Sequence, residues 1–85
     1  MMHYDVIEMQ PVDHLHLSVK FRDGLNGEVI FKKSHLNGVF EALKNPAIFS
    51  KVTCENGFVE WPGDIDLAPD AMYEEVKKSG VWKLF

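Results

Sequence analysis

Four acidic residues lie close together in the second half of the chain, at Glu60, Asp64, Asp66 and Asp70. Carboxylate oxygens that converge on one point can hold a hard divalent cation, and such a cation can activate water. The same acids can instead accept hydrogen bonds from backbone N–H groups in a turn and at the start of a helix. We expect this structural role. The alternative is a small divalent-metal-dependent enzyme that uses the four acids.

Two aromatic residues, Trp61 and Tyr73, flank these acids and could line a shallow pocket beside them. Aromatic residues at a strand end and on the inner face of a helix more often belong to the core, because they carry a large apolar surface. We therefore expect core positions for both. An exposed Trp61 would instead be the leading anchor for a partner, since Trp and Tyr dominate binding hot spots.

The segment 81–85 is apolar, with Trp82, Leu84 and Phe85. We expect it to fold back as an edge strand that closes the core. An exposed apolar segment would instead require a cover, which a partner or a second copy of the chain would supply. The candidate interaction residues are therefore Trp61, Asp64, Asp66, Asp70, Tyr73, Trp82 and Phe85.

Two histidines and one cysteine are the remaining residues that could bind a metal or act in catalysis. His14 and His16 lie two residues apart on a predicted strand and hence on one face, a spacing that can bind zinc. No third ligand is evident, so we expect a solvated outer face. Cys54 stands alone, and an unactivated thiol on a core strand behaves as a small hydrophobic group. We expect no catalytic residue, no metal and no cofactor.

Composition narrows the class of protein. The formal net charge is −4, and seven acids but no Lys or Arg lie between Val52 and Val76. Nucleic-acid binding needs clustered positive charge, so direct contact with nucleic acid is not expected. No apolar run approaches the roughly 18 residues of a membrane span, and the N-terminus has no signal-peptide pattern. With one cysteine in 85 residues, the chain is expected to form a single domain, 1–85, in the cytoplasm.

The elements that must position these residues follow from hydrophobic periodicity and turn chemistry. Apolar residues alternate strictly from Leu15 to Phe21, which indicates a strand. Asn-Gly between two β-type runs predicts a hairpin, and a proline followed by helical spacing predicts a helix. The expected elements are strands at 6–9, 15–21, 28–32, 52–54 and 58–61, a helix within 34–44, a turn at 46–49, and a helix from Pro69 that ends at Gly80.

These elements predict an α+β fold. We expect a small antiparallel sheet of about five strands, made from a meander plus a hairpin. Two or three short helices are expected to pack on one face of this sheet.

One group of residues suggests a family. They are Leu15, Leu17, Phe21, Asp23-Gly24, Gly38-Val39-Phe40, Leu43, Phe49, Val52, the run Glu60-Trp61-Pro62-Gly63-Asp64-Ile65-Asp66-Leu67-Ala68-Pro69-Asp70, and Tyr73. Over nearly the whole chain they resemble the small bacterial family known as domain of unknown function 2442. The resemblance implies an α+β domain with no established activity. The family pattern favours Ser at the position of Ala68, where a hydroxyl would cap the helix.

The resemblance also implies partners. Relatives are commonly encoded beside a second small protein, as in toxin–antitoxin pairs, and some carry a helix-turn-helix after this domain. We therefore expect a non-enzymatic interaction module, antitoxin-like or regulatory, whose partner is another small protein or a second copy of itself. The alternatives are the metal-dependent enzyme above and an accessory domain of a helix-turn-helix transcriptional regulator.

Overall fold

The computed structural model describes residues 4–84, apart from the side chains of His35 and Val39. Its main sheet contains four strands in the spatial order β1-β2-β3-β6. The strands are β1 (Val6–Asp13), β2 (His16–Phe21), β3 (Asn26–Phe31) and β6 (Val81–Leu84). The first three form an antiparallel meander, and β6 pairs with β3 in the parallel direction. The sheet is therefore mixed.

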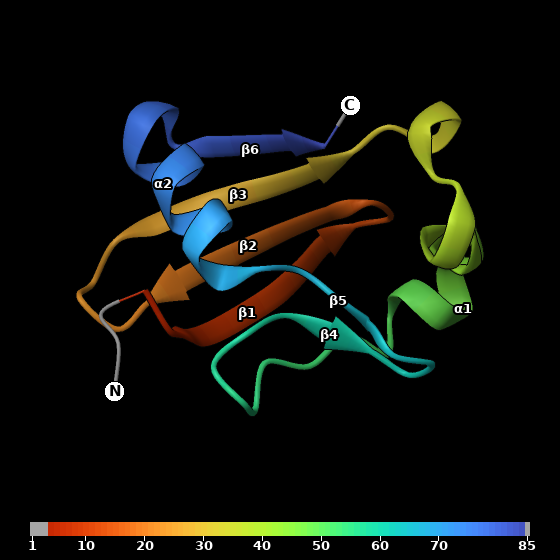
Figure 1. Ribbon diagram of the computed structural model, residues 1–85, viewed down its shortest axis with the longest axis horizontal. Helices are drawn as coiled ribbons and strands as arrows, with labels where there is room; N and C mark the ends of the chain where they lie inside the picture. The colour runs from red at the N-terminus through yellow and green to blue at the C-terminus, as the bar shows by residue number, and fades with distance from the viewer. Residues whose placement is uncertain (1–3, 85) are drawn as a thin grey trace.

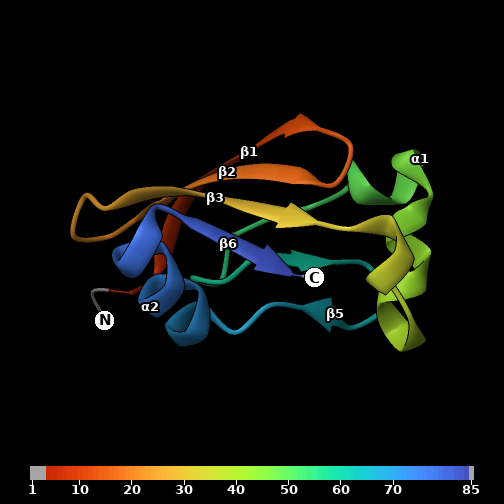
Figure 2. The same ribbon diagram turned by 90° about the horizontal axis from the view of Figure 1, so that it is seen from above.

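All remaining elements lie on one side of this sheet or at one end of it (Figures 1 and 2). Helix α2 (Pro69–Ser79) and a small antiparallel sheet of β4 (Glu60–Trp61) and β5 (Ile65–Asp66) form a second layer. Two 3₁₀ turns and a one-turn helix lie at the end of the sheet. These are η1 (Lys33–His35), η2 (Gly38–Lys44) and α1 (Pro46–Phe49). The opposite face of the four-stranded sheet is left uncovered by the described residues (Figure 2).

The core lies between the two layers. In β2 the residues Leu17, Val19 and Phe21 are all buried, as period-two alternation requires of one strand face. They meet Met72 and Val76, which face inward from α2 at helical spacing. Leu43 of η2, Phe49 of α1 and Trp61 of β4, with the neighbouring Val59, belong to the same core. One continuous core thus connects both layers.

Helix α2 has the boundaries that the sequence predicts. Pro69 occupies the first turn, where its missing N–H is not needed. Gly80 ends the helix with φ of 82°, in the left-handed conformation that glycine adopts without a steric penalty. The helix then leads directly into β6. The chain between β3 and β6 crosses over the sheet and ends with α2. The strand that follows, β6, therefore enters the sheet parallel to β3.

The predicted α+β class is confirmed, but the predicted antiparallel sheet of about five strands fits only roughly, because the main sheet has four strands and is mixed, and β4 and β5 form a separate sheet. The final segment joins the sheet as the expected edge strand, although Phe85 lies outside the described residues. The expected hairpin of 52–54 and 58–61 is reduced to one isolated bridge between Thr53 and Glu60. Glu60 and Trp61 pair instead with Asp66 and Ile65. The Asn-Gly turn therefore forms without two full strands beside it.

Three further boundaries differ from the sequence prediction. β1 continues through Pro11 to Asp13, which an edge strand allows because the missing N–H can face solvent. Leu15 belongs to the two-residue turn between β1 and β2, with φ of 64°. The helix expected within 34–44 consists of 3₁₀ turns, and Gly38, the first residue of η2, has φ of 60°. A positive φ interrupts a right-handed helix, so no continuous α-helix forms there.

Candidate interaction surface

The β4–β5 hairpin places two of the candidate acids opposite each other. Glu60 is paired with Asp66, and the neighbouring pair is Trp61 with Ile65. Trp61 and Ile65 are buried, so the two carboxylates point away from the core. Directly opposite residues have Cβ atoms about 4.5–5.5 Å apart, at which like charges destabilise the pairing. The hairpin therefore carries a repulsive pair of carboxylates on its outer face.

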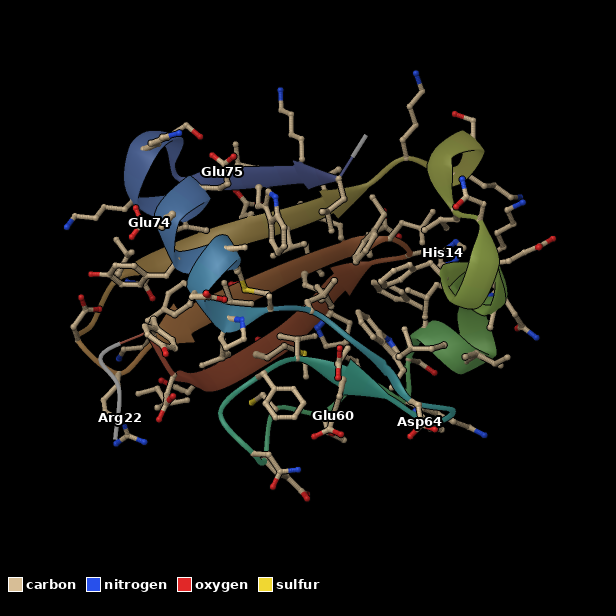
Figure 3. The ribbon with its side chains drawn as sticks, viewed as in Figure 1. His14, Arg22, Glu60, Asp64, Glu74 and Glu75 are labelled. Carbon is tan, nitrogen blue, oxygen red and sulfur yellow. The ribbon has the colours of Figure 1, made fainter. Side chains whose placement is uncertain are left out.

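The turn of this hairpin adds a third acid. Gly63 and Asp64 both have positive φ, 92° and 62°. Asp tolerates the left-handed region better than most residues, which accounts for an acid in this turn. Its side chain is exposed at the outer end of the hairpin, on the same side of the molecule as Glu60 (Figure 3). Asp64 thus has a backbone role and an exposed carboxylate as well.

These three acids have no cation beside them among the described residues. The ion pairs within residues 4–84 involve Glu8, Glu28, Glu41, Glu75 and Asp5 instead. Within residues 4–84, the one side-chain partner of these three acids is neutral: Asn56 Nδ2 donates to Glu60 Oε2 at 2.8 Å. We name Glu60, Asp64 and Asp66 the hairpin acids.

Asp70 belongs to the start of α2. It lies in the first helical turn, where a negative charge interacts favourably with the helix dipole. The N-cap residue, Ala68, makes no side-chain hydrogen bond. Asp70 is therefore the acid that supports this helix end. Glu74 and Glu75, further along α2, lie on the far side of the molecule from Glu60 and Asp64 (Figure 3).

The acids do not assemble a metal site in the described part of the chain. Between residues 4 and 84, no group of three or more His, Cys, Asp or Glu side chains is close enough to hold a metal ion. The hairpin acids and the acids of α2 instead occupy separate elements.

Both aromatic residues that flank the acids are part of the core. Trp61 is 3% exposed, and its Nε1 donates to the carbonyl oxygen of Phe49 at 2.9 Å. The Tyr73 ring is also buried and meets Phe21 edge-on, with centroids 5.1 Å apart. Its hydroxyl donates to Asp23 Oδ2 at 2.5 Å. Neither ring is available as a surface anchor.

The Tyr73 hydroxyl is perturbed by its partner. The hydrogen bond to Asp23, followed by burial and the negative charges of Asp23 and Glu74, raises the pKa of Tyr73 above its ordinary value of 10.0. A phenol that donates to a carboxylate is favoured in its neutral form. This contact joins α2 to the turn between β2 and β3.

Trp82 differs from Trp61, because it is only half-buried where it packs against the core from the edge strand β6. It lines a groove of about 320 Å³ together with Glu75, Ser79, Val81 and Lys83. Of the aromatic interaction candidates, Trp82 is thus the one described at the surface. Phe85 lies outside the described residues.

The two histidines do not share a strand face, and the expected solvated outer face is wrong for His14, which packs edge-on against Phe49. His14 lies in the β1–β2 turn, where its Nε2 donates to the carbonyl oxygen of Leu43 at 2.9 Å. His16 lies on β2 and pairs through Nε2 with Glu28 Oε1 of β3. The tight turn separates them, because Leu15 adopts positive φ there rather than a strand conformation.

Cys54 has the environment of an unreactive thiol. Burial, and then the negative charges of Glu55 and Glu8, raise the pKa of Cys54 above its ordinary value of 9.0. The nucleophilic thiolate is therefore scarce at neutral pH. The thiol lines an open cavity of about 560 Å³ whose other walls include Asp5, Ile7 and Arg22.

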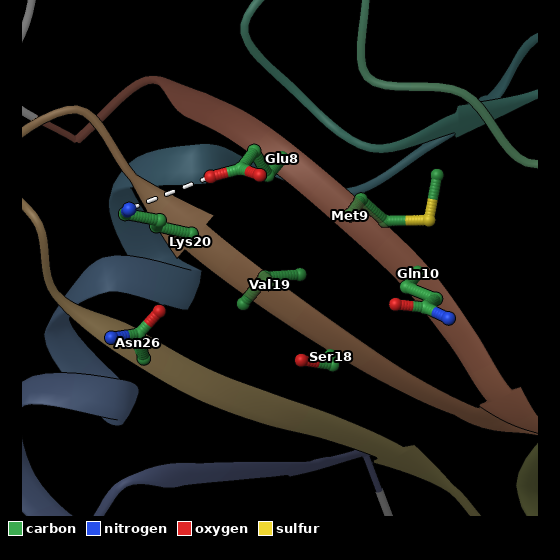
Figure 4. A pocket seen from close by; sticks show the side chains of 7 residues that line it. All are labelled: Glu8, Met9, Gln10, Ser18, Val19, Lys20 and Asn26. Carbon is green, nitrogen blue, oxygen red and sulfur yellow. Dashed lines mark ion pairs between the residues drawn. The ribbon is translucent and has the colours of Figure 1, made fainter.

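The uncovered face of the main sheet is a surface that the sequence candidates missed. A depression of about 190 Å³ lies over β1, β2 and β3, and five of its seven lining residues are polar or charged. Figure 4 shows the side chains that line it. Its charged pair is Lys20 with Glu8, whose Nζ and Oε2 atoms are 3.5 Å apart. The signal was present in the alternation of β2, because His16, Ser18 and Lys20 occupy the face opposite the core. Three polar residues on this face of β2 predict that the face is open to solvent.

The fold and these surfaces define a small α+β protein with an open-faced mixed sheet and an acidic hairpin. The family model described as protein of unknown function (DUF2442) matches residues 6–78, and the chain belongs to this family. No curated protein and no solved structure matches the chain. Across the described residues, no helix is long and apolar enough to cross a membrane.

Proposed function

We propose that the protein is a cytoplasmic, non-enzymatic interaction module that binds a small partner protein through the hairpin acids. The partner surface is basic. The observation that carries this proposal is the placement of Glu60 directly opposite Asp66 on the outer face of the β4–β5 hairpin. A Lys or Arg side chain between the two carboxylates would convert their repulsion into two attractive contacts.

The chemistry of the neighbouring groups supports binding rather than catalysis. Trp61 and Tyr73 donate hydrogen bonds within the fold, and the Cys54 thiol is held in its protonated form. The family resemblance, in which relatives are encoded beside a second small protein, favours that neighbour as the partner. The module then acts as an antitoxin-like or regulatory subunit.

Co-expression with the adjacent gene product tests this proposal. We expect the tagged chain to retain its neighbour at low salt and to lose it progressively as salt is raised, because the contact is ionic. The variant Glu60→Gln/Asp66→Asn removes the paired charges and should weaken retention. Glu41→Gln is the matched control, because Glu41 is an exposed acid on η2 that pairs with Lys44.

Two results would count against the proposal. One is the absence of co-purification at micromolar concentration. The other is equal loss of retention in the hairpin variant and the Glu41→Gln control, which would place the contact elsewhere.

A further inference from the structure

The two edges of the main sheet differ in how well they are closed. The β1 edge contains Pro11, and its register is irregular at Val6/Glu8 and at Pro11/Asp13. A loop also covers part of it, since Val6 N donates to the carbonyl oxygen of Gly57 at 2.8 Å. Proline, bulges and covering loops are the features that prevent strand addition. The β6 edge, from Val81 to Leu84, has a regular register.

The backbone of β6 presents hydrogen-bonding groups to solvent. Glu28 N donates to the carbonyl oxygen of Gly80, so Gly80 directs its backbone toward β3. Backbone groups alternate in direction along a strand, so Trp82 and Leu84 also face β3, whereas Val81 and Lys83 face the open edge. Ser79 Oγ donates to the Val81 carbonyl oxygen at 3.0 Å. That oxygen retains a second lone pair for another donor.

Two side chains of this edge are unengaged within residues 4–84. Lys83 is exposed and has no ion pair there, and the indole N–H of Trp82 has no acceptor. Trp82 nevertheless lies half-exposed in the groove beside Glu75. The edge thus combines outward backbone groups, an aromatic surface and a cation.

We propose that a second copy of the chain binds at this edge, with the two β6 strands antiparallel about a two-fold axis at Trp82. Val81 of each copy then faces Lys83 of the other, and the outward backbone groups of these residues bond reciprocally. The two Trp82 residues form the central pair on the core side, with Cα atoms about 4.5 Å apart. The two four-stranded sheets become one continuous sheet.

The opposite charges of Glu28 and Lys83 favour this register and favour a second copy of the chain as the partner. Glu28 lies opposite Val81 within one copy, so Lys83 of the second copy falls in the same row on the open face. Its Cα is two strand spacings from that of Glu28, about 10 Å, which a lysine and a glutamate side chain together span. A two-fold register centred on Lys83 would instead place two lysines opposite each other. The contact occurs twice in the dimer because the interface is isologous.

Sedimentation equilibrium of the full chain over a wide concentration range tests the proposal. We expect a concentration-dependent dimer, weak because a single short strand pair buries little area. Lys83→Pro removes an N–H that points away from β3, so the monomer should persist, as circular dichroism would verify, and the dimer should be lost. Lys83→Glu keeps the backbone and should raise the dimer Kd about tenfold or more, because it places a second carboxylate in the same row as Glu28.

A charge swap and a matched control complete the design. Glu28→Lys combined with Lys83→Glu should restore the dimer, whereas Lys51→Glu, at an exposed lysine between α1 and β4, should leave the Kd unchanged. A chain that stays monomeric at every concentration overturns the proposal. A dimer whose Kd neither Lys83 variant changes also overturns it. So does a Lys83 variant that keeps the dimer and loses only the binding of a different protein. The hairpin variant Glu60→Gln/Asp66→Asn should still dimerise, so this result is separate from the proposed function.

Discussion

The two tryptophans have different surroundings, and this difference can be measured. Trp61 is buried and donates its N–H to the Phe49 carbonyl, whereas Trp82 is half-exposed on β6. Removing the buried donor leaves that carbonyl with one longer bond, from Val52 N at 3.3 Å. The loss of one hydrogen bond and of ring volume should therefore be resolvable in the stability of the whole chain.

We predict that Trp61→Phe lowers the free energy of unfolding by about 1–3 kcal/mol in urea titrations. Trp82→Phe is the control, with an expected change within about 1 kcal/mol because the site is partly solvated. Equal effects of the two substitutions would contradict the burial and hydrogen bonding described for Trp61.

Tyr73 provides a pH-dependent test at the same scale. Its raised pKa means that the unfolded chain releases the phenolic proton first, at the ordinary value of 10.0. The folded chain resists ionisation, so the stabilising contribution is complete below pH 10.0 and is lost as the pH rises through the folded-state pKa. Tyr73→Phe should be less stable than the natural chain at neutral pH, and the gap should narrow above pH 10.0.

Absorbance of tyrosinate gives the direct measurement for this prediction. The natural chain, with two tyrosines, should show a transition above the ordinary range that Tyr73→Phe removes. Asp23→Asn should move that transition toward lower pH, because the amide lacks the negative charge that disfavours tyrosinate. A Tyr73 transition that lies in the ordinary range, or that Asp23→Asn leaves unchanged, would refute the contact.

At the scale of the elements, a close approach between β3 and α2 fixes the distance between the layers. A Cβ atom at Gly27 would lie 2.2 Å from Val76 Cγ1, well inside any allowed contact. We predict that Gly27→Ala destabilises the fold by about 1–3 kcal/mol through overpacking. Thermal and urea unfolding would report it.

A double-mutant cycle isolates the cause of this effect. Val76→Ala removes the methyl groups that the new Cβ would meet, so the double variant should cost less than the sum of the two single changes. Additive costs would show that Gly27→Ala acts on the strand and not on the packing of α2.

The sequence predicted the elements that follow strong local patterns. The alternation of β2 and the proline start and glycine end of α2 are local signals, and both elements are confirmed. The parallel pairing of β6 depends on the path of α2 across the sheet, and no local pattern encodes it. The partner of β4 depends on a competition between the segments that precede and follow it. Thr53 offers Glu60 a single bridge, whereas Ile65 and Asp66 give β4 two consecutive pairs.

The surface could be predicted only in part for the same reason. Asp64 and Asp66 stand out in the sequence, but the pairing of Asp66 with Glu60 appears only once β5 is known to exist. The position of Leu15 in a left-handed turn separated His14 from His16, and a strand pattern gives no warning of it. A sequence pattern orders residues along one element, whereas a site needs the register between elements.

At the scale of the whole molecule, charge is distributed unevenly, and part of the distribution opposes folding. Seven acids and no Lys or Arg lie between Val52 and Val76 in a chain of net charge −4. Within that region Asp66 faces another carboxylate, whereas Asp70 lies at the positive end of a helix dipole. The two residues have the same charge and should have opposite effects on stability.

We predict that Asp66→Asn raises the free energy of unfolding by about 0.2–1 kcal/mol at low ionic strength, because it relieves the repulsion with Glu60. Asp70→Asn should lower it by about 0.3–1 kcal/mol through loss of the dipole interaction. Both differences should shrink as salt shortens the Debye length from about 10 Å at 0.1 M to about 3 Å at 1 M. Urea titrations at the two salt concentrations would measure them. If Asp66→Asn destabilised the chain as Asp70→Asn does, Asp66 would hold the hairpin together. The repulsion that favours a basic partner would then be absent.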